Sequence, residues 1–153
     1  MITVGLSFTA YKRNIIWQDE FFLWQDTVAK SPNISRPHNS LGVAYANKGL
    51  FNEAITHFQI AVKKGSGLQE VHHFNLALAY HDKGSLKEAV FELQEAIKIK
   101  INYPDAYCKL GFFYKDMDMI GEAEIAFKNA VKYAPNRDDF HNAEKWLWVG
   151  QKH

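Results

Sequence analysis

A block of about 34 residues occurs three times in this 153-residue chain, and this repeat constrains the fold more than any other feature. Each copy has a leucine followed by a small residue, then tyrosine, alanine, a large apolar residue and alanine at matching places. The three series are Leu41-Gly42, Tyr45, Ala54, Phe58, Ala61; Leu76-Ala77, Tyr80, Ala89, Leu93, Ala96; and Leu110-Gly111, Tyr114, Ala123, Phe127, Ala130. A unit this short cannot bury its own apolar face, so stacked units are predicted.

The spacing inside each unit predicts two helices joined by a short turn. Leu41 and Tyr45 are four residues apart, and Ala54 and Phe58 follow the same helical interval. The intervening turns read Asn47-Lys48-Gly49 and Asp82-Lys83-Gly84, where glycine supplies the positive φ that ends a helix. The third unit has Asp116-Met117-Asp118 there, so we expect its turn to differ. Small residues are expected where the paired helices approach closely, and large ones where a gap must be filled.

A 34-residue helix-turn-helix unit with these residues resembles the tetratricopeptide repeat. The resemblance covers Ser35 to Asn136 and includes Pro135, which closes the third unit. It implies an all-α fold, a right-handed superhelical solenoid in which the first helix of each repeat lines a concave face. The expected repeats are residues 35–69, 70–103 and 104–137.

Both flanks continue the pattern more weakly. Residues 1–34 are expected to form an apolar stub, Met1 to Tyr11, followed by one degenerate repeat helix. Residues 138–153, which carry Trp146 and Trp148, are expected to form a capping helix that shields the last apolar face.

Composition excludes several classes of function. Lys and Arg total 18 against 17 Asp and Glu, and a net charge of +1 gives no electrostatic case for nucleic acid or an anionic membrane. Cys108 is the single cysteine, so an intrachain disulfide and a cysteine-based zinc site are excluded. No run reaches the roughly 18 apolar residues that a membrane span requires.

Histidines are the main candidates for chemistry. His38, His73 and His141 occupy equivalent places in successive first helices, which favours packing between repeats over metal binding. Glu70 and His73 have the i, i+3 spacing of paired ligands, but no second pair faces them. No phosphate loop, zinc-protease motif or nucleophile elbow is present. We therefore expect no catalytic residue, cofactor or metal, and a metal-dependent enzyme using Glu70 and His73 is the least favoured of three hypotheses.

The favoured hypothesis is a non-catalytic scaffold that binds a peptide or protein segment in the concave groove. If the register holds, the inward-facing positions mix apolar anchors with polar groups of both signs: Arg36, Asn39, Val43, Asn47, Phe74, Asn75, Leu78, His81, Asp82, Asp105, Cys108, Phe112, Lys115 and Asp116. Some tetratricopeptide domains clamp a C-terminal carboxylate with basic residues and asparagines. Of the clamp positions here, Asn75 matches, but Asn39, Val43, Asp105 and Lys109 replace the others, and an acid at 105 repels a carboxylate. No such clamp is expected.

A second resemblance supplies the alternative hypothesis. The segments Arg13-Asn14-x-x-Trp17, Leu23-Trp24-x-Asp26 and Lys30-Ser31-Pro32, which run into Arg36-Pro37-His38, look like the junction of multi-pass membrane mannosyltransferase-like proteins that carry a tetratricopeptide tail. The chain is then the accessory tail of a glycosyltransferase-like protein, positions acceptor proteins, has that membrane part as a partner, and faces outside the cytoplasm. Lys12-Arg13 instead favours a cytoplasmic side. Compartment, oligomeric state and partner identity stay open.

Overall fold

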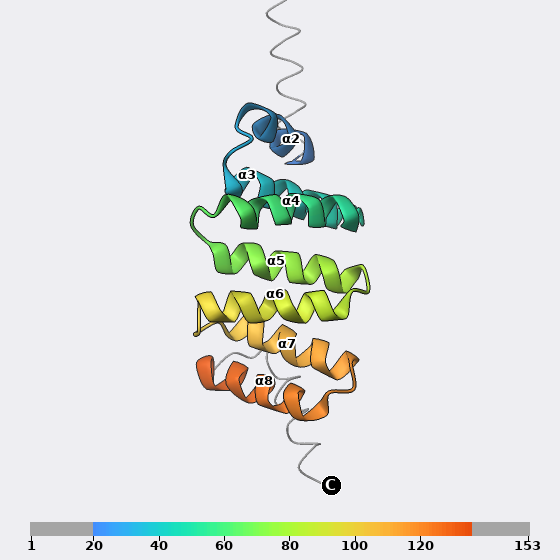
Figure 1. Ribbon diagram of the computed structural model, residues 1–153, viewed down its shortest axis with the longest axis vertical. Coiled ribbons are helices and arrows are strands. Elements are labelled where there is room, and N and C mark those ends of the chain that lie inside the picture. Colours follow the sequence, from blue (N-terminus) through green and yellow to red (C-terminus); the bar gives the residue numbers. More distant parts are fainter. Residues whose placement is uncertain (1–19, 136–153) are drawn as a thin grey trace, which may run out of the picture. The chain divides into compact units, whose positions relative to one another are not determined.

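The computed structural model describes residues 20–135, and this part of the chain contains seven α-helices and no strand (Figure 1). The helices are α2 (Glu20–Lys30), α3 (Ser35–Asn47), α4 (Phe51–Lys64), α5 (Gln69–Asp82), α6 (Leu86–Ile99), α7 (Pro104–Asp116) and α8 (Ile120–Tyr133). The predicted all-α fold of paired helices is confirmed. The expected stub at 1–11 and the capping helix at 138–153 lie outside the described residues. None of the described helices is long and apolar enough to cross a membrane.

The chain divides into two compact units, residues 1–66 and 67–153. In the first unit α2 packs against α3, and α3 pairs with α4. In the second, α5 pairs with α6 and α7 with α8, while α6 contacts α7 (Figure 1). The Gln94 amide on α6 donates a 2.8 Å hydrogen bond to the Tyr114 hydroxyl on α7, which joins the two helical pairs of this unit.

The three turns inside the pairs close in the same way. Gly49 and Gly84 adopt φ of +74° and +87°, and Asp118, at the matching place in the third turn, adopts +58°. In each turn the residue that follows donates its backbone N–H to a carbonyl five residues earlier, as in a Schellman cap: Leu50 to Tyr45, Ser85 to Tyr80, and Met119 to Tyr114, at 3.0, 2.8 and 2.9 Å. The expectation of a different third turn was therefore wrong in geometry. Aspartate tolerates the left-handed conformation well enough to replace glycine.

Each helical pair is held by a small residue facing a large one. A Cβ built on Gly42 would lie 2.7 Å from the Phe58 ring, and one built on Gly111 would lie 2.5 Å from the Phe127 ring. Both rings are buried. In the middle repeat the corresponding residues are Ala77 and Leu93, both 0% exposed. Alanine is larger than glycine and leucine is smaller than phenylalanine, so the two changes in size offset each other. The Gly42–Phe58 and Gly111–Phe127 contacts confirm the expected close approach of the paired helices.

The two described histidines of the repeat pattern form hydrogen bonds within their own unit. His38 Nε2 donates to the Pro32 carbonyl at 3.0 Å, so in a neutral ring its Nδ1 accepts the proton of His57 Nδ1, 3.1 Å away. His73 Nδ1 lies 2.6 Å from Glu92 Oε2. Both partners come from the second helix of the same repeat, 19 residues later. These bonds add a polar link within each pair, and His38 also contacts the turn that precedes its repeat; the expected role in packing between repeats stays a prediction.

Candidate functional site

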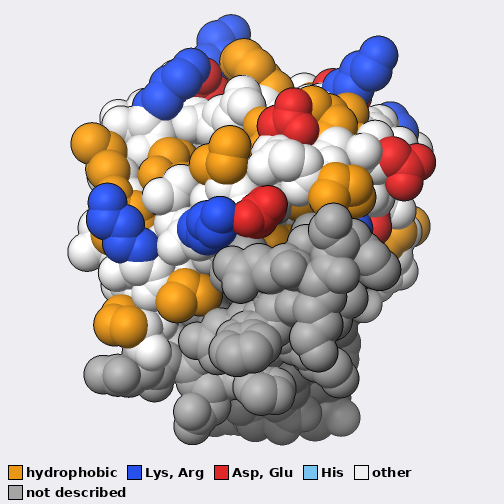
Figure 2. Space-filling view, turned by 90° about the horizontal axis from the view of Figure 1, so that it is seen from below, with side chains coloured by type: hydrophobic (Ala, Val, Ile, Leu, Met, Phe, Trp, Pro, Cys, Tyr) orange, Lys and Arg blue, Asp and Glu red, His pale blue; other side chains and the backbone are white. Residues whose placement is uncertain are grey.

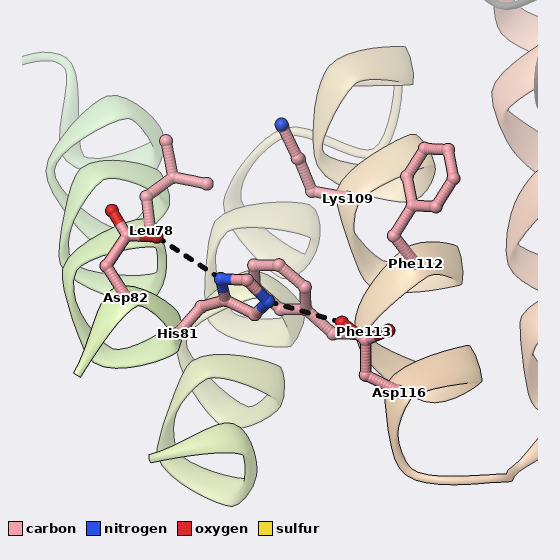
Figure 3. Close-up of a pocket in the computed structure, with 7 residues that line it drawn as sticks. All are labelled: Leu78, His81, Asp82, Lys109, Phe112, Phe113 and Asp116. Carbon is pink, nitrogen blue, oxygen red and sulfur yellow. Dashed lines mark hydrogen bonds and ion pairs between the residues drawn. The ribbon is translucent and has the colours of Figure 1, made fainter. Parts of the chain in front are cut away.

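A cavity of about 310 Å³ lies between α5 and α7 in the second unit (Figure 3). Its lining comes from these two helices alone: Leu78, His81 and Asp82 on α5, and Lys109, Phe112, Phe113 and Asp116 on α7. Helix geometry explains why these residues meet. Positions three, four and seven apart lie on one helical face, and each set follows those intervals. Two parallel stripes therefore form opposite walls.

His81 joins the two walls. Its ring stacks on the Phe113 ring, with centroids 4.2 Å apart and planes within 6°. Its Nδ1 lies 3.3 Å from Asp82 Oδ1, and its Nε2 lies 3.3 Å from Asp116 Oδ2 (Figure 3). A neutral imidazole has one N–H and donates to only one of these carboxylates, whereas an imidazolium donates to both.

The apolar wall is anchored in the core. Phe113 is only 3% exposed, and Phe112 packs edge-on against the Phe127 ring, with centroids 5.0 Å apart. Leu78 packs against the same core cluster. The wall is therefore held in place by packing, and a preformed cavity costs a ligand little ordering.

The residues that line the cavity include more acidic side chains than lysine or arginine side chains. The Asp82 and Asp116 side chains are each 50% exposed, and Lys109 is the one lysine in the lining. Figure 3 shows the Lys109 chain rising away from the His81 ring. Elsewhere charges are mixed: the face in Figure 2 carries lysine or arginine and acidic side chains interspersed with separate hydrophobic ones.

Five of the groove residues expected from the sequence line this cavity: Leu78, His81, Asp82, Phe112 and Asp116. Lys109 and Phe113 were not in that set. The signal for Lys109 was its position three residues before Phe112 on the same face. Phe113 is a core residue, 3% exposed, whose ring stacks on His81 in the lining.

Other expected groove residues lie elsewhere in the second unit. Phe74 packs on Tyr103, with ring centroids 5.3 Å apart, and belongs to the edge of the core. Burial first, and then the charges of Asp105 and Glu70, raise the pKa of Tyr103 to about 12, so this phenol stays neutral. Asn75, Asp105, Cys108 and Lys115 do not line the cavity. Arg36, Asn39, Val43 and Asn47 belong to the first unit, and their part in a groove stays a prediction.

Metal binding gains no support from the described residues. Residues 20–135 contain no group of three His, Cys, Asp or Glu side chains placed to hold an ion. His73, one of the two residues of the sequence pair, has its Nδ1 2.6 Å from Glu92 Oε2.

The comparisons with known proteins agree on the repeat. Residues 77–118 match the family described as TPR repeat, and residues 104–137 match the family described as Tetratricopeptide repeat. The second match coincides with the third repeat expected from the sequence. No curated protein matches the sequence significantly.

Several solved structures share the fold. MamA is 24% identical with a TM-score of 0.74, and the match covers 84% of this chain and 75% of MamA. The first TPR of Spaghetti (RPAP3), bound to HSP90 peptide SRMEEVD, is 18% identical with a TM-score of 0.70 over 78% of this chain and 94% of that one. The Arabidopsis OM64 TPR domain is 22% identical with a TM-score of 0.69 over 76% and 95%. Residues 77–137 thus match tetratricopeptide repeats, a kind of repeat that generally serves as a non-catalytic module for binding proteins or peptides. The neighbouring solved structures show the same fold.

Proposed function

We propose that these tetratricopeptide repeats form a non-catalytic scaffold that binds a peptide or protein segment along the first helices. The observation that carries the proposal is the cavity between α5 and α7, the first helices of two successive repeats. It combines an apolar wall anchored in the core with polar groups of both signs. That combination suits a segment whose side chains alternate between anchoring in a pocket and hydrogen bonding.

The charges argue against an acidic C-terminal peptide as the ligand. The peptide bound by the Spaghetti domain ends in Glu-Glu-Val-Asp. Here Asp82 and Asp116 line the cavity, and Asp105 stands at a position where a carboxylate clamp needs a base. Like charges brought together at an interface oppose binding. The scaffold is therefore proposed to select a different class of segment.

A capture experiment with two Phe→Ala variants tests the proposal. The purified full chain is immobilised, and the proteins it retains are quantified by mass spectrometry. A segment of the retained protein is then titrated by calorimetry. Phe112→Ala, in the cavity, is expected to lose capture, whereas Phe91→Ala, on α6 and 56% exposed outside the cavity, is expected to keep it.

Phe112 also supports the core, so a second variant separates binding from stability. Lys109→Glu reverses an exposed charge in the cavity lining and should change affinity without changing helicity by circular dichroism. Equal capture by the wild-type chain and both cavity variants would contradict the proposal.

The alternative, an accessory tail of a membrane glycosyltransferase-like protein, stays a prediction from residues 13–38. Neither the family matches nor the solved structures bear on it. Sequencing the gene upstream of the Met1 codon tests it. An extended reading frame that encodes several apolar spans would support the alternative, and its absence would remove it.

A further inference from the structure

We propose that the cavity between α5 and α7 is a subsite for an arginine side chain of the bound segment. The inference rests on the proposed function and adds the chemistry of one residue of the ligand. The geometry that points to it is a flat aromatic floor bordered by two carboxylates.

The floor is the His81 ring lying on Phe113. One face of the imidazole is covered by Phe113, and both ring nitrogens face carboxylate oxygens. The His81 side chain is nevertheless 33% exposed. Because Phe113 covers one ring face, we infer that the opposite ring face contributes to this exposure. A planar group stacks on such a face, and guanidinium is the planar cation among side chains.

The border supplies the charge. Asp82 and Asp116 approach the imidazole from opposite sides, each at 3.3 Å, and each side chain is half exposed. Each carboxylate has a second oxygen and unused lone pairs. A guanidinium stacked on His81 would direct its N–H groups outward in the same way as the imidazole nitrogens, towards these carboxylates. Arginine has five N–H donors in one plane, whereas lysine has a point charge that stacks poorly.

The apolar wall accommodates the rest of the side chain. Leu78 and Phe112 line the same cavity and are held by core packing. The three methylenes of arginine are apolar and bury against such surfaces while the charged head stays at a polar rim. A cavity of about 310 Å³ is large enough for one such side chain. An acidic ligand residue would instead meet two carboxylates and one lysine in this lining.

The test uses four acetylated heptapeptides, Gly-Ala-Leu-Xaa-Leu-Ala-Gly amide, in which Xaa is arginine, lysine, norleucine or glutamate. Each is titrated into the 15N-labelled full chain, and amide shifts of α5 and α7 report binding. We expect the arginine peptide to bind about 10-fold tighter than the norleucine peptide and tighter than the lysine peptide. A hydrogen bond to a charged group lowers the dissociation constant about 10-fold or more. The glutamate peptide should bind most weakly.

Charge-matched variants then locate the effect. Asp82→Asn and Asp116→Asn should each weaken the arginine peptide about 10-fold and leave the norleucine peptide unchanged. Asp118→Asn is the control. It removes the same charge two residues beyond Asp116, outside the cavity lining, and asparagine tolerates the positive φ at that position. Its effect should stay below about 2-fold, since exposed charges are screened.

Three results would overturn the arginine subsite even though the peptides bind. They are equal binding of the arginine and norleucine peptides, tighter binding of the glutamate peptide, and equal losses in Asp116→Asn and Asp118→Asn. In the first two cases the peptides still shift the α5 and α7 amides, so the proposed function stands and only the ligand chemistry fails. If no peptide shifts these amides, the subsite is refuted, and the capture experiment with Lys109→Glu judges the scaffold separately.

Discussion

Replacing Gly111 by alanine should destabilise the third repeat, and a second substitution should reverse much of the loss. The added Cβ would lie 2.5, 2.6 and 2.8 Å from three carbons of the Phe127 ring, whereas ordinary contact begins at 3.4 Å. Phe127 is 0% exposed and its ring also packs on Phe112, so a shift of the ring would disturb that contact.

Two effects of opposite sign set the magnitude. Overpacking a filled core costs about 1–3 kcal/mol. Alanine in place of glycine within a helix returns about 1 kcal/mol through backbone entropy. We therefore expect Gly111→Ala to lower the free energy of unfolding by up to about 2 kcal/mol. Gly121→Ala is the matched control: no neighbouring atom lies within 4 Å of the place its new Cβ would take, so stability should rise by up to about 1 kcal/mol.

The middle repeat indicates the rescue. There Ala77 and Leu93 occupy the corresponding positions in one core cluster, and both are fully buried. Phe127→Leu alone should cost about 1 kcal/mol or more by leaving a cavity. The double variant Gly111→Ala, Phe127→Leu reproduces the middle-repeat pair, so its loss should be smaller than the sum of the single losses by about 1 kcal/mol or more. Urea unfolding followed by circular dichroism measures all four free energies.

Additivity would refute this reasoning. If the double-variant loss equals the sum of the single losses within about 0.5 kcal/mol, the small and large residues are not coupled as the geometry requires. A stabilising Gly111→Ala would show the same, because helix propensity alone would then decide the outcome.

Three further predictions concern the turns, a buried histidine and the start of the first repeat. Asp118→Gly should stabilise the chain and Gly84→Ala should destabilise it, each by about 1 kcal/mol in urea unfolding, because both positions have positive φ; effects of the opposite sign would contradict the shared turn geometry. Burial, and secondarily the charge of the adjacent His73, lower the pKa of His72, so the unfolded chain binds more protons and stability should fall as pH drops below about 6.5. In His72→Leu the pH dependence of the unfolding free energy between about pH 5 and 7.5 should flatten, and an unchanged slope would exclude His72 as its source. Ser35→Ala should cost about 1–2 kcal/mol by thermal unfolding, because the fully buried Ser35 hydroxyl donates to the Ser66 carbonyl at 2.9 Å; a loss below about 0.3 kcal/mol would show that water replaces this bond.

Much of the fold could be read from the residues. Helix α7 begins at Pro104 and α3 at Ser35, where the repeats were expected to begin, and α5 begins one residue earlier than expected, at Gln69. Helical spacing depends only on neighbouring residues. A residue type that recurs every 34 or 35 positions is expected to make the equivalent contact in each repeat. The Gly42–Phe58 and Ala77–Leu93 pairs follow from that regularity.

The polar partners could not be read in this way. His38 and His73 are equivalent in sequence, yet one meets a histidine and the other a glutamate, because the matching position 19 residues later differs. His81 meets Asp116 from a different repeat, 35 residues away, and the sequence alone did not single out that pair.

The amino-acid sequence by itself therefore determined the helical pairs and the small-to-large packing inside each pair. These features depend on spacing within a helix, which the chain carries in its local order. Tertiary structure alone decided which side chains meet across α5 and α7, that Phe113 lies beneath His81, and that two carboxylates border the cavity. Such contacts depend on the separation and rotation of two helices and on side-chain rotamers, which packing of the whole unit sets.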